Sequence, residues 1–266
     1  WIFFPIAVAI ISADVFNLYV YGLFLFLYSL FRHFQEKGFQ DRSIFILLSK
    51  MAGLGLLGIA MNTVFIISPL MQMIDSPRVS GESGFFNTLR SVPVFGFADT
   101  IQYATAIMRS FSSDLMGVGS EYKGWYNYLE APIFYIGLIN LLLVPQVFQF
   151  LDKKNKILFG VFLGLWLFII VFPFFRYSLY LFSGDYYKVA MSFFVPVTML
   201  FTGISALSYV DRLNKINIKA LLGTFAVLII FLFYPFFPPD QNPVDQNLRS
   251  VIVFFLIIYV LLIYLL

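Results

Sequence analysis

The 266 residues are 61% hydrophobic and 20% aromatic, only 12% are charged, and the net charge is +3. A soluble globular domain carries roughly 25% charged residues, so this apolar excess is too large for a single soluble core. The lack of cysteine excludes disulfides, thiolate catalysis and cysteine-based metal sites, and a lone histidine, His33, excludes a histidine-cluster metal site. A divalent cation held by carboxylates stays compatible with the sequence. The charge pattern gives no indication of nucleic-acid binding.

Apolar runs of about 17–25 residues recur along the chain, and this is the length that a helix needs to cross a bilayer. The runs are continuously apolar instead of alternating, which favours helices over the strands of a membrane barrel. We therefore predict an all-α, polytopic membrane protein with about seven transmembrane helices, an N-terminal half-helix and a partly helical external loop. Because both ends fall within apolar runs, residues 1–266 are interpreted as a single transmembrane domain that is a fragment of a longer protein.

The predicted elements begin with a half-helix over residues 1–11. A polar break follows, in which Ser12 or Asp14 can cap the next helix. A span over about 16–34 and a polar connector then lead to a second span over about 43–71, whose small residues Gly53, Gly55, Gly58 and Ala60 suit close helix contact. After the long segment 72–131, further spans are predicted over residues 132–151, 156–175, 188–210, 218–237 and 250–266.

The charges of the short connectors predict the orientation, because lysine and arginine concentrate in cytoplasmic loops. One set of connectors carries nine basic and four acidic residues, and it alternates along the chain with a second set that holds seven basic and ten acidic residues. The basic residues of the first set are Arg32, Lys37, Arg42, Lys153, Lys154, Lys156, Arg212, Lys215 and Lys219. We assign this set to the cytoplasm, which makes 72–131 an extracytoplasmic loop.

The loop 72–131 is long enough to be a functional element. Apolar residues at helical spacing after a possible Asp99 cap predict an amphipathic helix on the bilayer surface: Ile101, Ala104, Ile107, Met108 and Phe111. A glycine-rich, aromatic stretch over 116–128 follows. Its Trp125, Tyr126 and Tyr128 could stack on a sugar, or they could belong to the aromatic belt found at membrane interfaces.

Several charged residues on the outer side are candidates for binding an anionic substrate. Lys188 and Arg176 flank a short turn and could hold a lipid-linked phosphate, or they could be anchors that set helix depth. Asp185 between them could pair with a cation or contact substrate. Arg78 and Arg90 of the long loop are further candidates, although solvated loop residues are the simpler interpretation of both. Asp14 could act as a general base, although a helix cap is the simpler interpretation.

Three stretches, in this order, resemble the YfhO family of bacterial membrane proteins. They are Ser76-Pro77-Arg78, the segment from Tyr128-Leu129-Glu130-Ala131-Pro132 to Leu143, and Asp185-Tyr186-Tyr187-Lys188. The resemblance implies a GT-C type glycosyltransferase of the bacterial inner membrane, which transfers a sugar from a polyprenyl-phosphate carrier to a cell-envelope polymer such as teichoic acid. It also implies a catalytic carboxylate in an earlier external loop, upstream of Trp1. The family tends to carry arginine where this chain has Lys188, so the charge is kept while bidentate phosphate binding is lost.

Two other functions remain open from the sequence. A transporter or lipid-linked sugar flippase would be expected to carry ionisable residues at mid-membrane, and the predicted span interiors hold almost none. A non-catalytic assembly subunit would need no outward-facing site. The chain carries no P-loop, GxSxG or HExxH motif, so residues alone establish only a membrane protein with a polar outer face.

Overall fold

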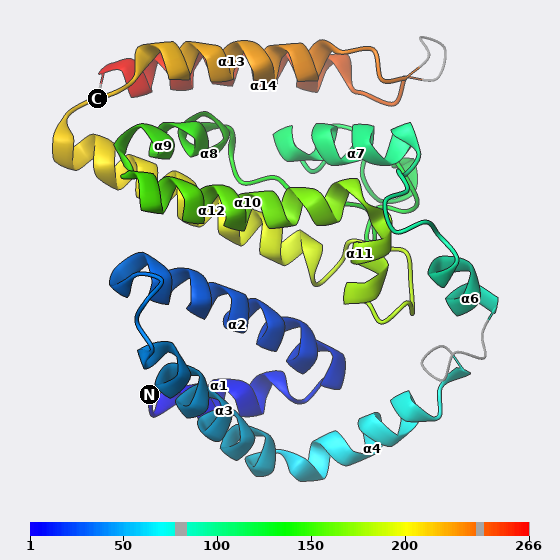
Figure 1. Cartoon of the computed structure of the whole chain (residues 1–266). Helices are drawn as coiled ribbons and strands as arrows, with labels where there is room; N and C mark the ends of the chain where they lie inside the picture. Colours follow the sequence, from blue (N-terminus) through cyan, green and yellow to red (C-terminus); the bar gives the residue numbers. More distant parts are fainter. Residues whose placement is uncertain (78–83, 238–241, 266) are drawn as a thin grey trace. The chain divides into compact units, whose positions relative to one another are not determined.

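The computed structural model of the chain describes residues 1–77, 84–237 and 242–265, and the regular elements in these ranges are helices, without a β-strand. Within the same ranges five helices are long and apolar enough to cross a membrane, which confirms the all-α, multi-pass fold class. Three other apolar helices, over Thr63–Ile74, Leu138–Phe150 and Ile218–Phe233, are shorter. The chain divides into two compact units, made of residues 1–94 with 174–185 and of residues 95–173 with 186–266 (Figure 1).

The first unit is built on α1 (Phe3–Ile11), α2 (Val15–Lys37) and α3 (Ser43–Met61), which pack against one another. The α1–α3 contact centres on Gly58, because a Cβ there would lie 2.8 Å from the Cβ of Val8 and would collide with the carbonyl oxygen of Pro5. The close contact predicted for the small residues of this span is therefore confirmed at Gly58. A Cβ at Gly53 or Gly55 would meet no other atom within 4 Å.

The predicted span 43–71 is wrong as a single helix, since the chain breaks at Asn62 into α3 and α4 (Thr63–Ile74). The hydroxyl of Thr63 donates to the carbonyls of Ile59 and Ala60 at 3.2 and 3.0 Å, so a side chain competes for the backbone acceptors at the break. Asn62 also donates to the hydroxyl of Ser12 at 3.1 Å, which joins this break to the one between α1 and α2. Helix α6 (Gly84–Arg90) follows.

The segment 174–185 also belongs to the first unit and contains most of α11 (Pro173–Leu179). Its Tyr180 stacks on Phe16 of α2, with ring centroids 5.7 Å apart, and its Phe182 meets Phe86 of α6 edge-on at 5.9 Å. The predicted span 156–175 is therefore corrected to α10 (Lys153–Val171) in the second unit. The helix ends there because Pro173 disfavours helical geometry in the residue before it.

The core of the second unit surrounds α8 (Leu138–Leu143), whose buried leucines face α12 (Met191–Leu213), α13 (Ile218–Phe233) and α14 (Gln246–Leu265). Helices α13 and α14 lie side by side (Figure 1). The predicted span 132–151 is corrected here. Residues before Gly137 are not helical, Gly137 itself has a φ of +85°, and the helix after it is interrupted by the short 3-10 turn Val144–Gln146 before α9 (Val147–Phe150).

In the second unit, hydrogen bonds join segments that lie between or next to the helices, at either end of those helices. At one end, Asn217 between α12 and α13 donates its backbone N–H to Gln146 at 3.3 Å and its side-chain amide to Gln149 at 3.0 Å. At the other end, the N–H of Asp245 donates to the carbonyl of Leu115 at 3.0 Å. The connectors joined at each end are those assigned to one side of the membrane by their charges. Which end faces the cytoplasm stays a prediction.

Candidate functional site

The candidate site lies in the second unit, where the loop before α8 meets the residues before α12. A pocket of about 580 Å³ opens there. It is lined by Gly119, Asn127, Tyr128, Leu129, Glu130 and Lys188. The pocket therefore brings together the glycine-rich aromatic stretch and Lys188, both of which were candidates from the sequence.

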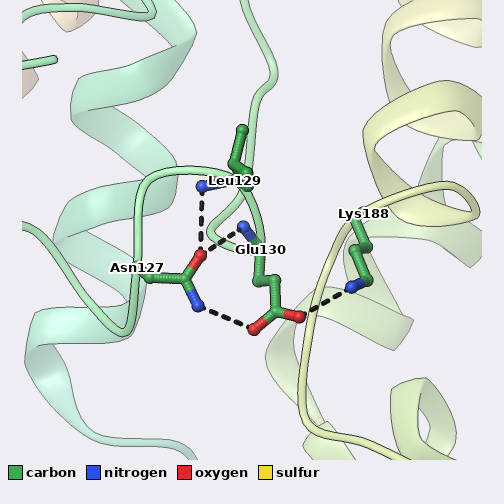
Figure 2. A network of polar contacts seen from close by, with 4 residues as sticks. All are labelled: Asn127, Leu129, Glu130 and Lys188. Carbon is green, nitrogen blue, oxygen red and sulfur yellow. Dashed lines mark hydrogen bonds and ion pairs between the residues drawn. The ribbon is translucent and has the colours of Figure 1, made fainter. Parts of the chain in front are cut away.

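Lys188 and Glu130 form the charged centre of this pocket. The ammonium Nζ of Lys188 donates to Oε1 of Glu130 at 2.7 Å, and the amide of Asn127 donates to Oε2 of the same carboxylate at 2.7 Å (Figure 2). Lys188 also lies 4.9 Å from the centre of the Tyr186 ring. The two side chains of the ion pair are partly exposed, 44% for Lys188 and 21% for Glu130, so a ligand in the pocket can reach both.

The backbone fixes the Glu130 side of the pocket. Oδ1 of Asn127 accepts from the N–H groups of Leu129 and Glu130 at 3.1 and 3.0 Å, the hydrogen-bonded turn that asparagine favours (Figure 2). The carbonyl of Glu130 then accepts from the N–H of Tyr187 at 2.8 Å, next to Lys188. These bonds join the two segments through the main chain as well as through the ion pair.

Val189 and Tyr126 hold unusual backbone conformations beside the same network. Their φ angles are +66° and +63°, in the left-handed region that non-glycine residues seldom adopt and that is especially unfavourable for a β-branched valine. Because a residue in this conformation cannot be part of a right-handed helix, α12 begins at Met191 and not at the predicted Lys188. Lys188 is thereby left on an irregular segment, with its side chain turned to Glu130.

Arg109 binds the loop segment that carries Tyr128, one of the residues that line the pocket. Arg109 was not identified from the sequence as a functional candidate. Its side chain is fully buried; Nε donates to the carbonyl of Ser113 and Nη1 to the carbonyl of Tyr128, both at 3.0 Å. The guanidinium lies 5.2 and 4.8 Å from the ring centres of Tyr122 and Tyr128. Burial lowers the pKa of Arg109, whereas the two tyrosines partly restore it. Gln102, Thr105 and Arg109 recur at helical spacing, and this polar stripe is the signal that could have identified a buried polar face.

The predicted amphipathic helix is present as α7 (Thr100–Phe111), but Asp99 caps it only by position because its side chain makes no capping bond. Of the apolar residues that define this helix, Ala104, Met108 and Phe111 are buried within the protein, whereas Ile101 is 41% exposed. The polar stripe of α7 is buried within its unit along with these apolar residues. The placement of α7 on the bilayer surface stays a prediction.

The aromatic candidates differ in their surroundings. Trp125 is half-buried, and its ring stacks on Tyr126 at 5.2 Å and meets Tyr187 edge-on at 5.6 Å. The backbone N–H of Trp125 donates to the hydroxyl of Thr105 at 2.9 Å. Tyr126 is 58% exposed. Tyr128 donates its hydroxyl to Asp114 at 3.1 Å, and this hydrogen bond, followed by burial, raises the pKa of Tyr128.

The remaining candidates lie in the first unit. Arg176 is buried and donates to Asp185 at 2.5 Å, and the other oxygen of that carboxylate accepts from Tyr177 at 3.2 Å, so Asp185 pairs with a cation; its contact with a substrate stays a prediction. Arg90 is exposed in the last turn of α6. Arg78 lies outside the described residues. Asp14 caps α2 by accepting from the N–H groups of Phe16 and Asn17 at 2.8 and 3.2 Å.

Each of the two predicted phosphate-binding cations therefore has a carboxylate partner of its own. Arg176 and Lys188 belong to different compact units, and their joint action on one phosphate stays a prediction. Among the described residues, no three acidic or histidine side chains gather as ligands for a metal ion. Comparison of the chain with protein-family models, with curated proteins and with solved structures found no match.

Proposed function

We propose that the chain is part of a GT-C type membrane glycosyltransferase. It would transfer a sugar from a polyprenyl-phosphate donor to a cell-envelope polymer, such as teichoic acid, on the outer face of a bacterial inner membrane. The observation that carries the proposal is the pocket of about 580 Å³ that holds Lys188 and Glu130 next to the start of the apolar helix α12. An ammonium and a carboxylate at the end of an apolar helix suit a substrate with a phosphate head and a lipid tail.

In the proposed reaction, an acceptor hydroxyl attacks the anomeric carbon of the sugar. The hydroxyl proton passes to a carboxylate, the bond between the anomeric carbon and the phosphate oxygen breaks, and its electron pair leaves with the lipid phosphate. Lys188 would exchange its contact with Glu130 for the phosphate and stabilise the charge on the leaving group. Glu130 and Asn127 would then accept and donate hydrogen bonds to hydroxyls of the sugar or the acceptor.

The family resemblance supports the same assignment. Two of the three stretches that resemble the YfhO family, those at 128–143 and 185–188, contribute Tyr128, Leu129, Glu130 and Lys188 to the pocket. They are distant in the sequence and adjacent in the structure, with the N–H of Tyr187 bonded to the carbonyl of Glu130.

Sugar transfer by the full-length protein in proteoliposomes tests the proposal. Lys188→Gln should lower the transfer rate by about 100-fold, the typical loss when one charge-stabilising donor is removed. Lys188→Arg should keep part of the activity, and Glu130→Gln should weaken substrate binding. Lys123→Gln is the matched control, because Lys123 is an exposed lysine of the same loop that does not line the pocket.

Equal transfer rates in Lys188→Gln and Lys123→Gln would contradict the proposal. Movement of the lipid-linked sugar across the vesicle membrane without transfer would instead identify a flippase. If neither transfer nor movement of the lipid-linked sugar occurs with the unmodified protein, a non-catalytic assembly subunit becomes the better interpretation.

A further inference from the structure

Two pockets follow one another along the α2–α3 pair in the first unit. The first, of about 380 Å³, lies toward the connector between the helices, and the second, of about 540 Å³, lies farther along both helices. Arg32, Lys37, Lys50 and the acidic Glu36 line the first pocket together with several apolar side chains, whereas the lining of the second is apolar throughout. Ser29 of the first pocket donates its hydroxyl to the sulfur of Met51 in the second at 3.3 Å, so the two pockets adjoin.

Lys50 is the charge in the first pocket that the protein does not neutralise. Arg32 pairs with Glu36 at 2.5 Å, and Lys37 lies 3.9 Å from Asp41. Lys50 is exposed and makes no hydrogen bond or ion pair within the part of the chain that the structure describes. At 1.5 Å per residue it lies about 10 Å along α3 from Ser43, close enough to the helix end for its long side chain to bring the ammonium to the membrane interface, where lipid head groups lie.

The second pocket has the character of a groove for a hydrocarbon chain. Its lining is apolar and includes Gly22 of α2 and Gly55 of α3. A Cβ built at either glycine would meet no other atom within 4 Å, so open space lies in front of both. This groove offers a ligand mainly apolar contact, and it adjoins the pocket that holds Arg32, Lys37 and Lys50.

We propose that these adjoining pockets, the α2–α3 groove, bind one anionic phospholipid. Its phosphate lies at Lys50, within reach of Arg32 and Lys37, and one acyl chain lies against Gly22 and Gly55. The arrangement of positive charge beside an apolar groove is complementary to an amphiphilic anion, whereas an apolar helix from another protein would leave Lys50 without a partner. The connector between α2 and α3 is predicted to be cytoplasmic, the side on which anionic lipids attract basic residues. This lipid site is independent of the proposed sugar-transfer site.

The head-group contact is tested by native mass spectrometry of the full-length protein released from nanodiscs that contain phosphatidylglycerol or phosphatidylcholine. We expect one phosphatidylglycerol to be retained in preference to phosphatidylcholine. Lys50→Gln should weaken its retention about fivefold, the effect of one basic residue on an anionic lipid. Lys153→Gln is the control, since Lys153 is an exposed lysine at the start of another membrane helix. Equal retention of the two lipids, or equal losses in the two variants, would overturn the proposal.

The acyl-chain contact is tested by filling the groove. Gly55→Leu places a side chain in the apolar pocket, whereas Gly53→Leu places one in open space that does not line it. Both variants should preserve thermal stability because a Cβ at either position meets no other atom within 4 Å. Gly55→Leu alone should abolish phosphatidylglycerol retention. Retention in both variants, or a changed oligomeric state in Gly55→Leu with lipid retention intact, would show that the groove holds something else and would overturn the proposal.

Discussion

Arg109 illustrates at the scale of one residue how the candidate site is held in shape. Its guanidinium is buried without a hydrogen bond at Nη2, and its charge is balanced by two carbonyls and two tyrosine rings. Hydrogen bonds from a charged group contribute more than neutral ones because the interior screens them weakly. Arg109 thus stabilises the loop that carries Tyr128, and through it one wall of the pocket.

Replacing Arg109 with methionine keeps most of the side-chain volume and removes these bonds. We expect the free energy of unfolding to fall by about 2–3 kcal/mol, since two carbonyls lose a charged donor. Thermal unfolding followed by tryptophan fluorescence measures the change. Arg90→Met, at an exposed position, should alter stability by less than about 0.5 kcal/mol. Similar shifts in the two variants would contradict the role assigned to Arg109.

Asp41 makes the stability of the start of α3 dependent on pH, because its ionised carboxylate accepts hydrogen bonds from Ser43. It accepts from the N–H of Ser43 at 2.7 Å, and this backbone bond, with a side-chain bond to Ser43, lowers the pKa of Asp41 below its ordinary value of 3.8. A carboxylate whose pKa is depressed in the folded state stabilises the protein above the unfolded pKa and loses that contribution as pH falls through the folded pKa. In Asp41→Asn, the loss of stability below pH 3.8 should therefore be smaller than in the unmodified protein. Acid unfolding curves of the two proteins measure it, and identical curves would contradict the assignment.

The residues of the site were only partly predictable. Lys188 was identified because a cation stood directly before an apolar segment. Glu130 likewise stands directly before an apolar segment. The pairing of Lys188 with Glu130, however, joins positions 58 residues apart and depends on the packing of α8 against α12, which the sequence does not reveal. A similar fold-dependent pairing determines that Asp185 holds Arg176. The backbone strain at Val189 has no signature in the sequence at all.

At the scale of the helices, the packing of α1 against α3 can be tested at Gly58. Gly58→Leu must displace α1, because the added atoms would collide with Pro5 and Val8. Overpacking of this kind costs about 1–3 kcal/mol. Gly53→Ala on the same helix meets open space and should be neutral or stabilise α3 by about 0.5–1 kcal/mol. Thermal unfolding of the two variants compares them, and a tolerated leucine at Gly58 would contradict the α1–α3 packing.

Helices were predicted well where one apolar run forms one element, as for α2, α12 and α14. The predictions failed where local chemistry interrupts an apolar run. One run breaks at Asn62, where the hydroxyl of Thr63 competes for backbone carbonyls, and Pro173 ends α10. The run at 132–151 looked long enough to span, but a left-handed Gly137 leaves only a short helix buried by its neighbours.

At the scale of the whole molecule, the predicted orientation can be tested directly, because the chain contains no cysteine. Val118 lies on the predicted outer loop and Lys215 in a predicted cytoplasmic connector, and both are exposed. We expect a membrane-impermeant thiol reagent to label Val118→Cys in intact cells and Lys215→Cys only after permeabilisation. The opposite pattern would reverse the orientation and would place the pocket of Lys188 on the cytoplasmic side.

The central claim is that the pocket of Lys188 and Glu130 binds a lipid-linked sugar phosphate. A photo-crosslinking amino acid at Leu129, which lines the pocket and is 72% exposed, tests it most directly. The full-length protein should crosslink to a radiolabelled polyprenyl-phosphate sugar from Leu129, lose the crosslink in Lys188→Gln, and give none from Ile101, an exposed residue away from the pocket. Equal crosslinking from both positions, or a crosslink unaffected by Lys188→Gln, would contradict the account.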